Sequence, residues 1–221
     1  MPHSQKILSV APVTHDVNRI RFEKPEGYAF VPGQATDVAL DKPGWETELR
    51  PFTFTCLNTD PYLEFTIKSY SDHDGVTNQI RQLKAGDRLI IHDPWGAIEY
   101  KGEGYFIAGG AGITPFIAIL RQLHKENRLA GNKLFFSNKT AADIIYEEEL
   151  KMMLGDNALF VVTDKADSAY LHEYINEIFL KKYVDAFDKQ FYICGPDPMI
   201  KSISDILIGQ GANPSAVIFE K

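Results

Sequence analysis

Cysteine is scarce in this sequence, with only Cys56 and Cys194 among 221 residues. A plant-type iron–sulfur cluster requires four thiolate ligands, so the chain cannot build such a cluster alone. A secretory hydrophobic segment is also absent, and no apolar run approaches the roughly 20 residues that cross a bilayer. These absences predict a cytoplasmic protein without a membrane span.

Positive charge is in short supply as well. The chain has 23 Lys and Arg against 30 Asp and Glu, which gives a net charge of −7. A broad nucleic-acid surface needs clustered cations to neutralise phosphates, so we expect no nucleic-acid partner. The six histidines show no metal-ligand spacing, and no nucleophile-elbow sequence appears, so neither a metal centre nor hydrolase chemistry is predicted.

Short apolar stretches broken by turn residues fill the first hundred residues. Several of them alternate, as Leu63, Phe65 and Ile67 do, which is typical of half-buried strands. The predicted strands are Lys6–Val13, Val17–Phe22, Ala35–Leu40, Phe52–Leu57, Leu63–Lys68 and Arg88–His92. One helix is predicted at Thr77–Leu83. The pattern indicates an all-β barrel or sandwich.

From Gly104 onward, strand-like runs alternate with longer amphipathic segments. The predicted strands are Tyr105–Ala108, Lys133–Ser137, Leu159–Thr163, Phe191–Cys194 and Ala216–Phe219. The predicted helices are Thr114–Glu126, Ala142–Leu154, Ala169–Leu180 and Pro198–Gln210. This alternation predicts a mostly parallel sheet with helices on both faces. We therefore expect two domains, residues 1–101 and residues 102–221.

A glycine-rich turn follows the first strand of the second half, at Gly109–Pro115. Glycines let the backbone approach a pyrophosphate, and the following helix offers unpaired N–H groups at its start, with Thr114 as a plausible N-cap. A tight turn without a ligand is the alternative reading. The next strand ends without an acidic residue, and Asn138 and Lys139 favour a 2′-phosphate, hence NADPH, unless they merely cap the next helix.

Three further segments carry candidate ligand groups. Cys194 ends a predicted parallel strand, where ligands lie in open α/β sheets, although a buried cysteine is more often inert. Arg50–Thr53 combines a cation, a flat ring and a hydroxyl, although an edge arginine is often simply solvated. Gly75–Thr77 opens the only predicted helix of the first half and offers an anion site.

Taken in this order, these motifs resemble the ferredoxin-NADP reductase superfamily, which includes flavodoxin reductases, cytochrome reductases and reductase components of oxygenases. The resemblance covers nearly the whole chain, and the order of the motifs is more specific than any one of them. It implies an antiparallel Greek-key β-barrel that binds FAD, followed by a doubly wound α/β domain that binds NADH or NADPH.

The resemblance also implies roles for individual residues. Arg50 would bind the FAD pyrophosphate, Phe52 would pack on the isoalloxazine, and Thr53 would bond near flavin N5. Cys194 would lie beside the nicotinamide, so Thr53 and Cys194 are the candidate catalytic residues. The remaining candidates for cofactor binding are Pro51, Ile67, Lys68, Ser69, Gly75, Val76, Thr77, Gly110, Gly112, Ile113, Thr114, Pro115, Asn138, Lys139, Gly195, Pro196, Met199 and Phe219.

Two departures from the family pattern stand out. Phe52 replaces a tyrosine found in many relatives, which keeps the stacking ring and loses its hydroxyl. Where the family often ends in a Glu, one residue and an aromatic that covers the flavin, this sequence ends in Glu220 and Lys221. The hypothesis is that Phe219 covers the nicotinamide-facing side of the flavin, or that this side is relatively open.

The implied activity is hydride transfer from NAD(P)H to FAD, with electrons passed on to a ferredoxin, a flavodoxin or an oxygenase component. One alternative is a reductase of free flavins. Another is an FAD-bearing electron-transfer subunit of a larger complex. A flavin-free dehydrogenase is a third, but it leaves the first hundred residues unexplained.

Overall fold

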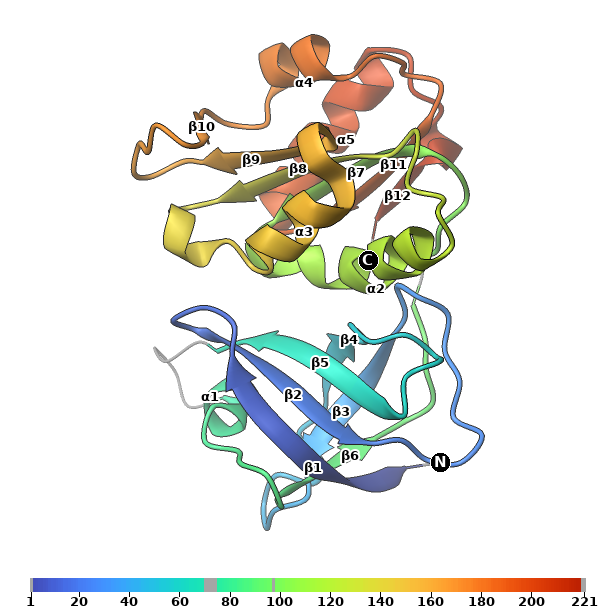
Figure 1. The fold of residues 1–221 in the computed structure, drawn as a ribbon, viewed down its shortest axis with the longest axis vertical. Coiled ribbons are helices and arrows are strands. Elements are labelled where there is room, and N and C mark those ends of the chain that lie inside the picture. The colour runs from blue at the N-terminus through green and yellow to red at the C-terminus, as the bar shows by residue number, and fades with distance from the viewer. Residues whose placement is uncertain (1, 70–74, 97, 220–221) are drawn as a thin grey trace.

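The computed structural model describes residues 2–69, 75–96 and 98–219, which form two sheets placed one above the other (Figure 1). The lower sheet contains β1 (His3–Pro12), β2 (Val17–Glu23), β3 (Ala35–Leu40), β4 (Arg50–Thr53), β5 (Tyr62–Lys68) and β6 (Arg88–Ile91), with the short helix α1 (Val76–Ile80). The strands lie in the order β4-β3-β6-β1-β2-β5, and every pair is antiparallel.

The two edges of this lower sheet approach each other. An isolated bridge joins Phe54, just after β4, to Phe65 in β5, and the amide of Thr55 donates to the carbonyl of Glu64 at 2.9 Å. The sheet therefore curls into a nearly closed barrel around a core that includes Phe22, Phe54 and Phe65. This confirms the predicted antiparallel barrel. The fourth strand begins at Arg50 and ends at Thr53, earlier than its apolar pattern predicted.

The upper sheet is parallel and has the order β10-β9-β8-β7-β11-β12. Its strands are β7 (Gly104–Gly109), β8 (Lys133–Asn138), β9 (Ala158–Val162), β10 (Leu171–His172), β11 (Gln190–Cys194) and β12 (Val217–Phe219). Its helices are α2 (Thr114–Lys125), α3 (Glu147–Leu154), α4 (Glu177–Tyr183) and α5 (Asp197–Gly209). Helices α2 and α3 pack on the face toward the barrel, and α4 and α5 pack on the other face (Figure 1). This confirms the predicted doubly wound domain.

The order of the strands reverses between β7 and β11. The chain winds from β7 outward through β8, β9 and β10, then returns to place β11 on the other side of β7. In open α/β sheets, this reversal leaves a crevice at the carboxyl ends of the two central strands. The loops that follow β7 and β11 therefore meet there.

Two predicted helices are wrong in extent. The segment predicted as a helix at Ala142–Leu154 starts within the 3₁₀ turn η2 (Ala141–Asp143), and a separate helix begins at Glu147. Tyr146 lies between them with a φ of 53°, a left-handed conformation that interrupts an α-helix. The capping box between Thr140 and Asp143 fixes the short turn.

The helix predicted at Ala169–Leu180 begins only at Glu177. Before it, Leu171 and His172 add a short parallel strand beside Val161 and Val162. The side chain of Asn176 accepts a hydrogen bond from the amide of Phe179 and thereby caps the helix. The edge of the sheet therefore takes residues whose apolar spacing had predicted a helix.

Within the described part of the chain, no helix combines the length and the apolar character needed to cross a membrane.

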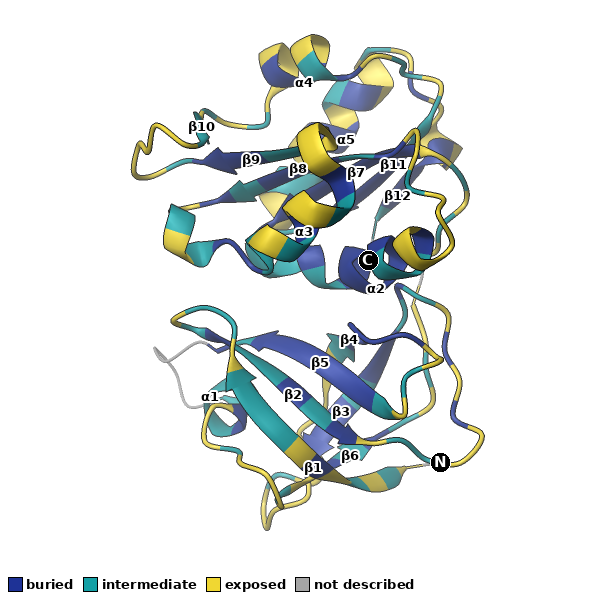
Figure 2. Ribbon diagram, viewed as in Figure 1, coloured by how far each residue is buried: buried dark blue, intermediate teal, exposed yellow. Residues whose placement is uncertain are grey.

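Strand β5 is buried on both sides, as Figure 2 shows. Leu63, Phe65 and Ile67 point into the barrel core, while Glu64 and Thr66 are also buried, at 1% and 5% exposure. The outer face of β5 is covered because Arg121 of α2 donates to Glu64 Oε1 at 2.8 Å and to the carbonyl of Thr55 at 2.5 Å. A buried charged contact therefore joins the two domains.

Glu64 is ionised in this position because cations surround it. Burial raises the pKa of its carboxyl, but Arg121 and Arg21 outweigh that effect and bring the pKa below its ordinary value. Arg21 Nε lies 2.8 Å from the carboxylate, and the hydroxyl of Thr55 donates to it at 3.0 Å. Without such partners, burial of a carboxylate would lower the free energy of unfolding by about 5 kcal/mol.

Acidification should therefore weaken the fold through Glu64. Because the pKa of Glu64 is lower in the folded protein than in the unfolded chain, its contribution is complete above the unfolded pKa and is lost as the pH falls below about 5. We expect Glu64→Gln to lower the free energy of unfolding at neutral pH by about 3 kcal/mol, since two guanidinium groups lose a buried carboxylate. The variant should then lose less stability on acidification than the wild type does.

Denaturant unfolding at neutral pH and at about pH 4 measures this difference. Glu148→Gln, at an exposed position of α3, is the matched control and should follow the wild type at both pH values. An equal acid-induced loss in the wild type and in Glu64→Gln would contradict the assignment.

Candidate functional site

A cleft of about 570 Å³ opens between the barrel and the α/β domain. We call it the interdomain cleft. From the barrel it is lined by Ala35, Pro51, Phe52, Thr53, Thr66, Ile67, Lys68, Thr77 and Trp95. From the α/β domain it is lined by Gly109, Ala111, Gly112, Thr114, Cys194, Gly195 and Pro196. Candidate residues from opposite halves of the sequence thus face one space.

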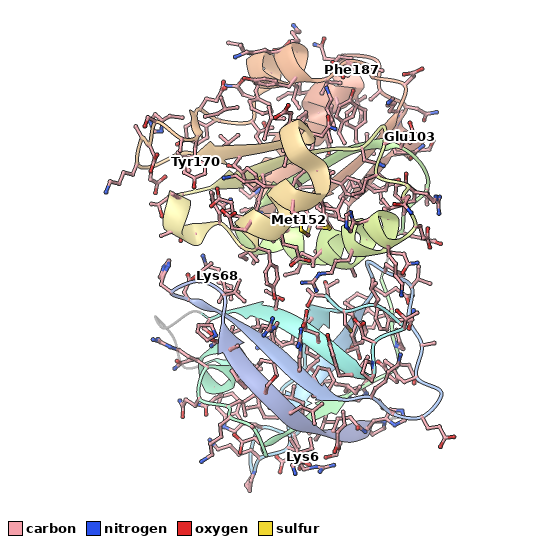
Figure 3. All side chains as sticks on the ribbon, viewed as in Figure 1. Lys6, Lys68, Glu103, Met152, Tyr170 and Phe187 are labelled. Atoms are coloured by element: carbon pink, nitrogen blue, oxygen red, sulfur yellow. The ribbon has the colours of Figure 1, made fainter. Side chains whose placement is uncertain are left out.

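The barrel wall of the cleft carries a ring, a hydroxyl and a cation. Phe52 is half-buried, and its ring centroid lies 6.0 Å from that of Phe65 in the barrel core. Thr53 follows it and is 9% exposed. Lys68 ends β5 at the top of the barrel, facing the α/β domain (Figure 3). This wall can pack against a flat heterocycle and donate polar contacts at its edge.

The opposite wall consists of backbone that glycine brings close together. A Cβ on Gly112 would lie 2.3 Å from the carbonyl oxygen of Cys194, so only glycine lets the turn after β7 touch the loop after β11. Gly110 has a φ of 53°, and a Cβ there would meet no atom within 4 Å. The turn therefore exposes backbone toward open space at the start of α2.

A second cleft, of about 550 Å³, continues from the first and shares Lys68, Gly109, Ala111 and Pro196 with it. Its other lining residues are His15, Asp16, Gly110, Ser137, Asn138, Lys139, Asp143, Thr163 and Met199. Asn138 is 4% exposed, and within the described part of the chain neither its Oδ1 nor its Nδ2 has a hydrogen-bond partner. A buried amide without partners is costly, so this cleft contains a polar group suited to a ligand.

Acidic groups share the second cleft with its cations. Lys68 Nζ lies 3.0 Å from Asp16 Oδ2, and His15 Nε2 lies 3.7 Å from Asp143 Oδ1. Burial raises the pKa of Asp16, but Lys68 and Thr14 outweigh it, so the pKa is below its ordinary value. Asp143 accepts bonds from the amide and the hydroxyl of Thr140. The second cleft therefore carries both acidic and basic side chains.

Several candidate residues lie outside both clefts. Arg50 is exposed at the start of β4, where its guanidinium donates to the carbonyl of Leu49 at 2.6 Å. Gly75 is the N-cap of α1, and Val76 belongs to the barrel core. Ser69 is buried just after β5, and its hydroxyl has no partner among the described residues.

The remaining candidates outside the clefts pack in the interior of the α/β domain. Ile113 and Pro115 are buried beside the glycine-rich turn. Phe219 pairs with Ile193 in the sheet and packs toward the core formed with α4 and α5, away from the interdomain cleft. Glu220 and Lys221, which entered the hypothesis about the flavin face, lie outside the described residues.

The sequence interpretation did not select several cleft residues. Trp95 received no role in it, although this residue is 39% exposed and lines the interdomain cleft. His15 and Asp16 lie in the turn between β1 and β2, and only the docking of the two domains brings them to Asp143. No local signal in the sequence marks such residues.

Comparison with known families gives two adjacent matches. Residues 4–100 match the family described as Oxidoreductase FAD-binding domain, and residues 106–205 match that described as Oxidoreductase NAD-binding domain. Together they account for both the barrel and the α/β domain.

Individual relatives are similar along most of the chain. The reductase component of propane 2-monooxygenase from Rhodococcus jostii strain RHA1 is 26% identical, covering 98% of this chain and 62% of the relative. NADH-cytochrome b5 reductase 1 of Eremothecium gossypii is 28% identical, covering 97% of this chain and 81% of the relative. The chain thus spans less than two thirds of the monooxygenase reductase.

A solved structure has the same fold. The ferredoxin NADP⁺ reductase from Neisseria gonorrhoeae, solved with bound FAD and NADP, superposes with a TM-score of 0.83 at 21% identity. The match covers 95% of this chain and 92% of that chain.

The contact between Gly112 and Cys194 can be tested by adding one methyl group. We expect Gly112→Ala to lower the free energy of unfolding by about 1–3 kcal/mol, because its Cβ would overlap the Cys194 carbonyl. It should also weaken nicotinamide dinucleotide binding, since the turn must move. Denaturant unfolding and calorimetric titration measure the two effects.

Gly209→Ala is the matched control, because a Cβ at this position in α5 meets no atom within 4 Å. This variant should be as stable as the wild type or slightly more stable, by about 0.5–1 kcal/mol. A Gly112→Ala protein with wild-type stability and binding would refute the close packing described above.

Proposed function

The chain belongs to the ferredoxin reductase-like superfamily of FAD-binding oxidoreductases, and from this premise we propose that it oxidises NADH or NADPH through bound FAD and delivers electrons to a separate acceptor. The acceptor would be a ferredoxin, a flavodoxin or an oxygenase component. Among the relatives, one is named as a reductase component of a monooxygenase and another as an electron transfer component of a dioxygenase, which supports this choice.

One observation carries the proposal. The interdomain cleft gathers Phe52 and Thr53 of the barrel and Gly112, Thr114 and Cys194 of the α/β domain around a single space. An enzyme that joins two redox cofactors must hold both in reacting geometry, and the main contribution of the protein is that orientation. A cleft lined from both domains supplies it.

The residues present fit FAD on the barrel side. Phe52 offers a ring to the isoalloxazine, and Thr53 offers a hydroxyl to its edge. Ile67–Ser69 offer backbone groups and the Ser69 hydroxyl, which has no partner among the residues that the structure describes. Arg50 and the segment Gly75–Thr77 would hold the phosphates, through a guanidinium fork and the N–H groups that open α1. We place the boundary of this domain at residue 101.

The residues present also fit a nicotinamide dinucleotide on the α/β side, in residues 102–221. Gly110–Pro115 would receive the pyrophosphate at the start of α2. Asn138 would use its amide, for which the described residues provide no partner. Cys194–Pro196 and Met199 would flank the nicotinamide. Lys139 favours a 2′-phosphate, whereas the carboxylates of Asp16 and Asp143 oppose one.

Bound FAD supplies the redox chemistry, because a flavin accepts two electrons from a reduced nicotinamide and releases them singly. The chain supplies position and polarity. Thr53 would place a hydroxyl donor at the reacting edge, and Cys194, at the carboxyl end of β11, would limit how the nicotinamide approaches. Phe52 would exclude water from one face of the ring.

A cytoplasmic location is part of the proposal. Cys56 and Cys194 form no disulfide, and both domains bind cofactors that are plentiful in the reducing cytoplasm.

An anaerobic absorption titration tests the central claim. We expect the purified protein to retain FAD after excess flavin is removed, and the flavin band to bleach when about one equivalent of the preferred nucleotide is added. Separate titrations with NADH and NADPH identify the donor. A protein that does not retain FAD, or that is not bleached by either nucleotide, would sink the proposal.

Arg50 can be tested by comparing two flavins. We expect Arg50→Ala to weaken FAD binding about tenfold or more, because a charge-assisted contact to the pyrophosphate contributes about 1.5–3 kcal/mol. Riboflavin lacks both phosphates, so its affinity should change much less. Flavin fluorescence titrations measure both constants.

Arg88→Ala removes another exposed barrel arginine, one that hydrogen-bonds to Ser4, and serves as the control. It should leave the affinity for FAD unchanged. An equal loss of FAD and riboflavin binding in Arg50→Ala would show that Arg50 does not act on the pyrophosphate.

A further inference from the structure

Arg121 lines neither cleft, yet it lies on an element that forms one of the cleft walls. Helix α2 begins at Thr114, which faces the interdomain cleft, and Arg121 follows seven residues later, about 10 Å along the helix axis. Its partner Glu64 lies on β5, whose last residues, Thr66–Lys68, form the opposite wall. One side chain therefore connects the two walls.

The guanidinium of Arg121 is held from three directions. Its Nε and Nη2 form a fork on the carboxylate of Glu149 in α3, at 2.6 and 2.9 Å. Its Nη1 donates to Glu64 at 2.8 Å and to the carbonyl of Thr55 at 2.5 Å. Burial lowers the pKa of Arg121, but Glu149 and Glu64 more than reverse that effect and hold it above its ordinary value. This cation cannot move without breaking several directional contacts.

A second contact supports the first. The hydroxyl of Tyr146 lies 3.1 Å from the hydroxyl of Thr66, which lines the cleft, and the Arg121 guanidinium lies 5.1 Å from the centre of the Tyr146 ring. Tyr146 holds a left-handed backbone, with a φ of 53°, immediately before α3. A non-glycine residue in this region stores backbone strain, which surrounding contacts must offset.

We propose that Arg121 is a positioning residue, which holds α2, α3 and β5 in one arrangement and so sets the distance between the two walls of the interdomain cleft. The inference rests on the proposed function, because the distance matters where two cofactors must meet. Displacement of reacting groups by about 1 Å can slow a reaction about a hundredfold. Arg121 would thus control the rate of flavin reduction without touching either cofactor.

The chemistry of the contact favours a geometric role over a purely stabilising one. A buried ion pair contributes little more stability than apolar residues of the same volume, because desolvation offsets most of the attraction. Apolar surfaces, however, slide with little loss, whereas a planar guanidinium with fixed partners permits a single register. A directional charged contact between the domains suits a fixed separation.

Four variants test the proposal, each prepared in the full chain with FAD. Arg121→Met removes the charge and keeps most of the volume, and Arg121→Lys keeps the charge but cannot form the fork on Glu149 and also reach Glu64 and Thr55. Glu64→Gln replaces the carboxylate partner of Arg121 by a neutral amide. Arg128→Met removes a more exposed arginine just beyond α2, paired with Glu126, and is the matched control.

The main readout separates binding from rate. We expect Arg121→Met to slow the single-turnover bleaching of FAD at saturating nucleotide by about tenfold or more. The dissociation constants of FAD and of the nucleotide should stay within about threefold of the wild type, since Arg121 lines neither cleft. The bleaching rate of Arg121→Lys should fall between the rates of Arg121→Met and the wild type. The rate of Arg128→Met should match that of the wild type.

A second readout needs no cofactor. In the ligand-free protein, amide hydrogen exchange at Thr55, which donates to Glu64, and at Leu150, which donates to Tyr146, should be faster in Arg121→Met than in Arg128→Met. This comparison reports the contact between the domains even if the redox activity proves to be different from that proposed.

The outcomes are distinct. Wild-type reduction rates in Arg121→Met, or a rate loss that merely parallels lost FAD affinity, would overturn the positioning role while leaving the proposed function intact. If neither nucleotide bleaches the wild type, the proposed function fails, and unchanged hydrogen exchange would then overturn the positioning role separately. If Arg121→Met does not fold, Arg121→Lys decides, and a wild-type rate in it counts against the proposal.

Discussion

The buried carboxylate of Glu64 is the constraint on which the arrangement of the two domains depends. Its side chain is 1% exposed on the outer face of a barrel strand, a position that would normally face water. An ionised group so deeply buried requires cationic partners, and the α/β domain supplies one of them as Arg121. Docking of the domains therefore buries Glu64 and, through Arg121, supplies a contact that compensates for its lost hydration.

The two clefts follow from this docking together with the winding of the sheet. The reversal between β7 and β11 brings the loops after these strands side by side. Gly112 lets the loop after β7 touch the backbone of Cys194, the last residue of β11. The barrel then places the ends of β4 and β5 opposite these loops. Neither domain alone forms the interdomain cleft, because each contributes only one wall.

Local patterns in the sequence predict most of the fold but not the contacts that join its halves. Alternation and turn residues identified the strands of both sheets apart from β10, since side-chain direction in a strand depends on nearest neighbours. The two helix errors arose where tertiary contacts override spacing, at Tyr146 and at the edge strand Leu171–His172. The glycine-rich turn at Gly109–Pro115 could also be predicted, because neighbouring residues alone define it. Arg121 and Glu64 are 57 residues apart, and no local pattern in the sequence predicts that they pair.

Two buried polar groups could form hydrogen bonds with a bound ligand. The hydroxyl of Ser69 and the amide of Asn138 are buried and have no hydrogen-bond partner among the described residues, one after β5 of the barrel and the other at the end of β8. Each such group costs about 1–3 kcal/mol relative to a hydrogen-bonded one. Asn138 borders the second cleft, so a ligand there that supplies the missing partners would recover this energy. A flavin on one side and a dinucleotide on the other carry suitable donors and acceptors, so the same groups that weaken the empty protein would strengthen the complex.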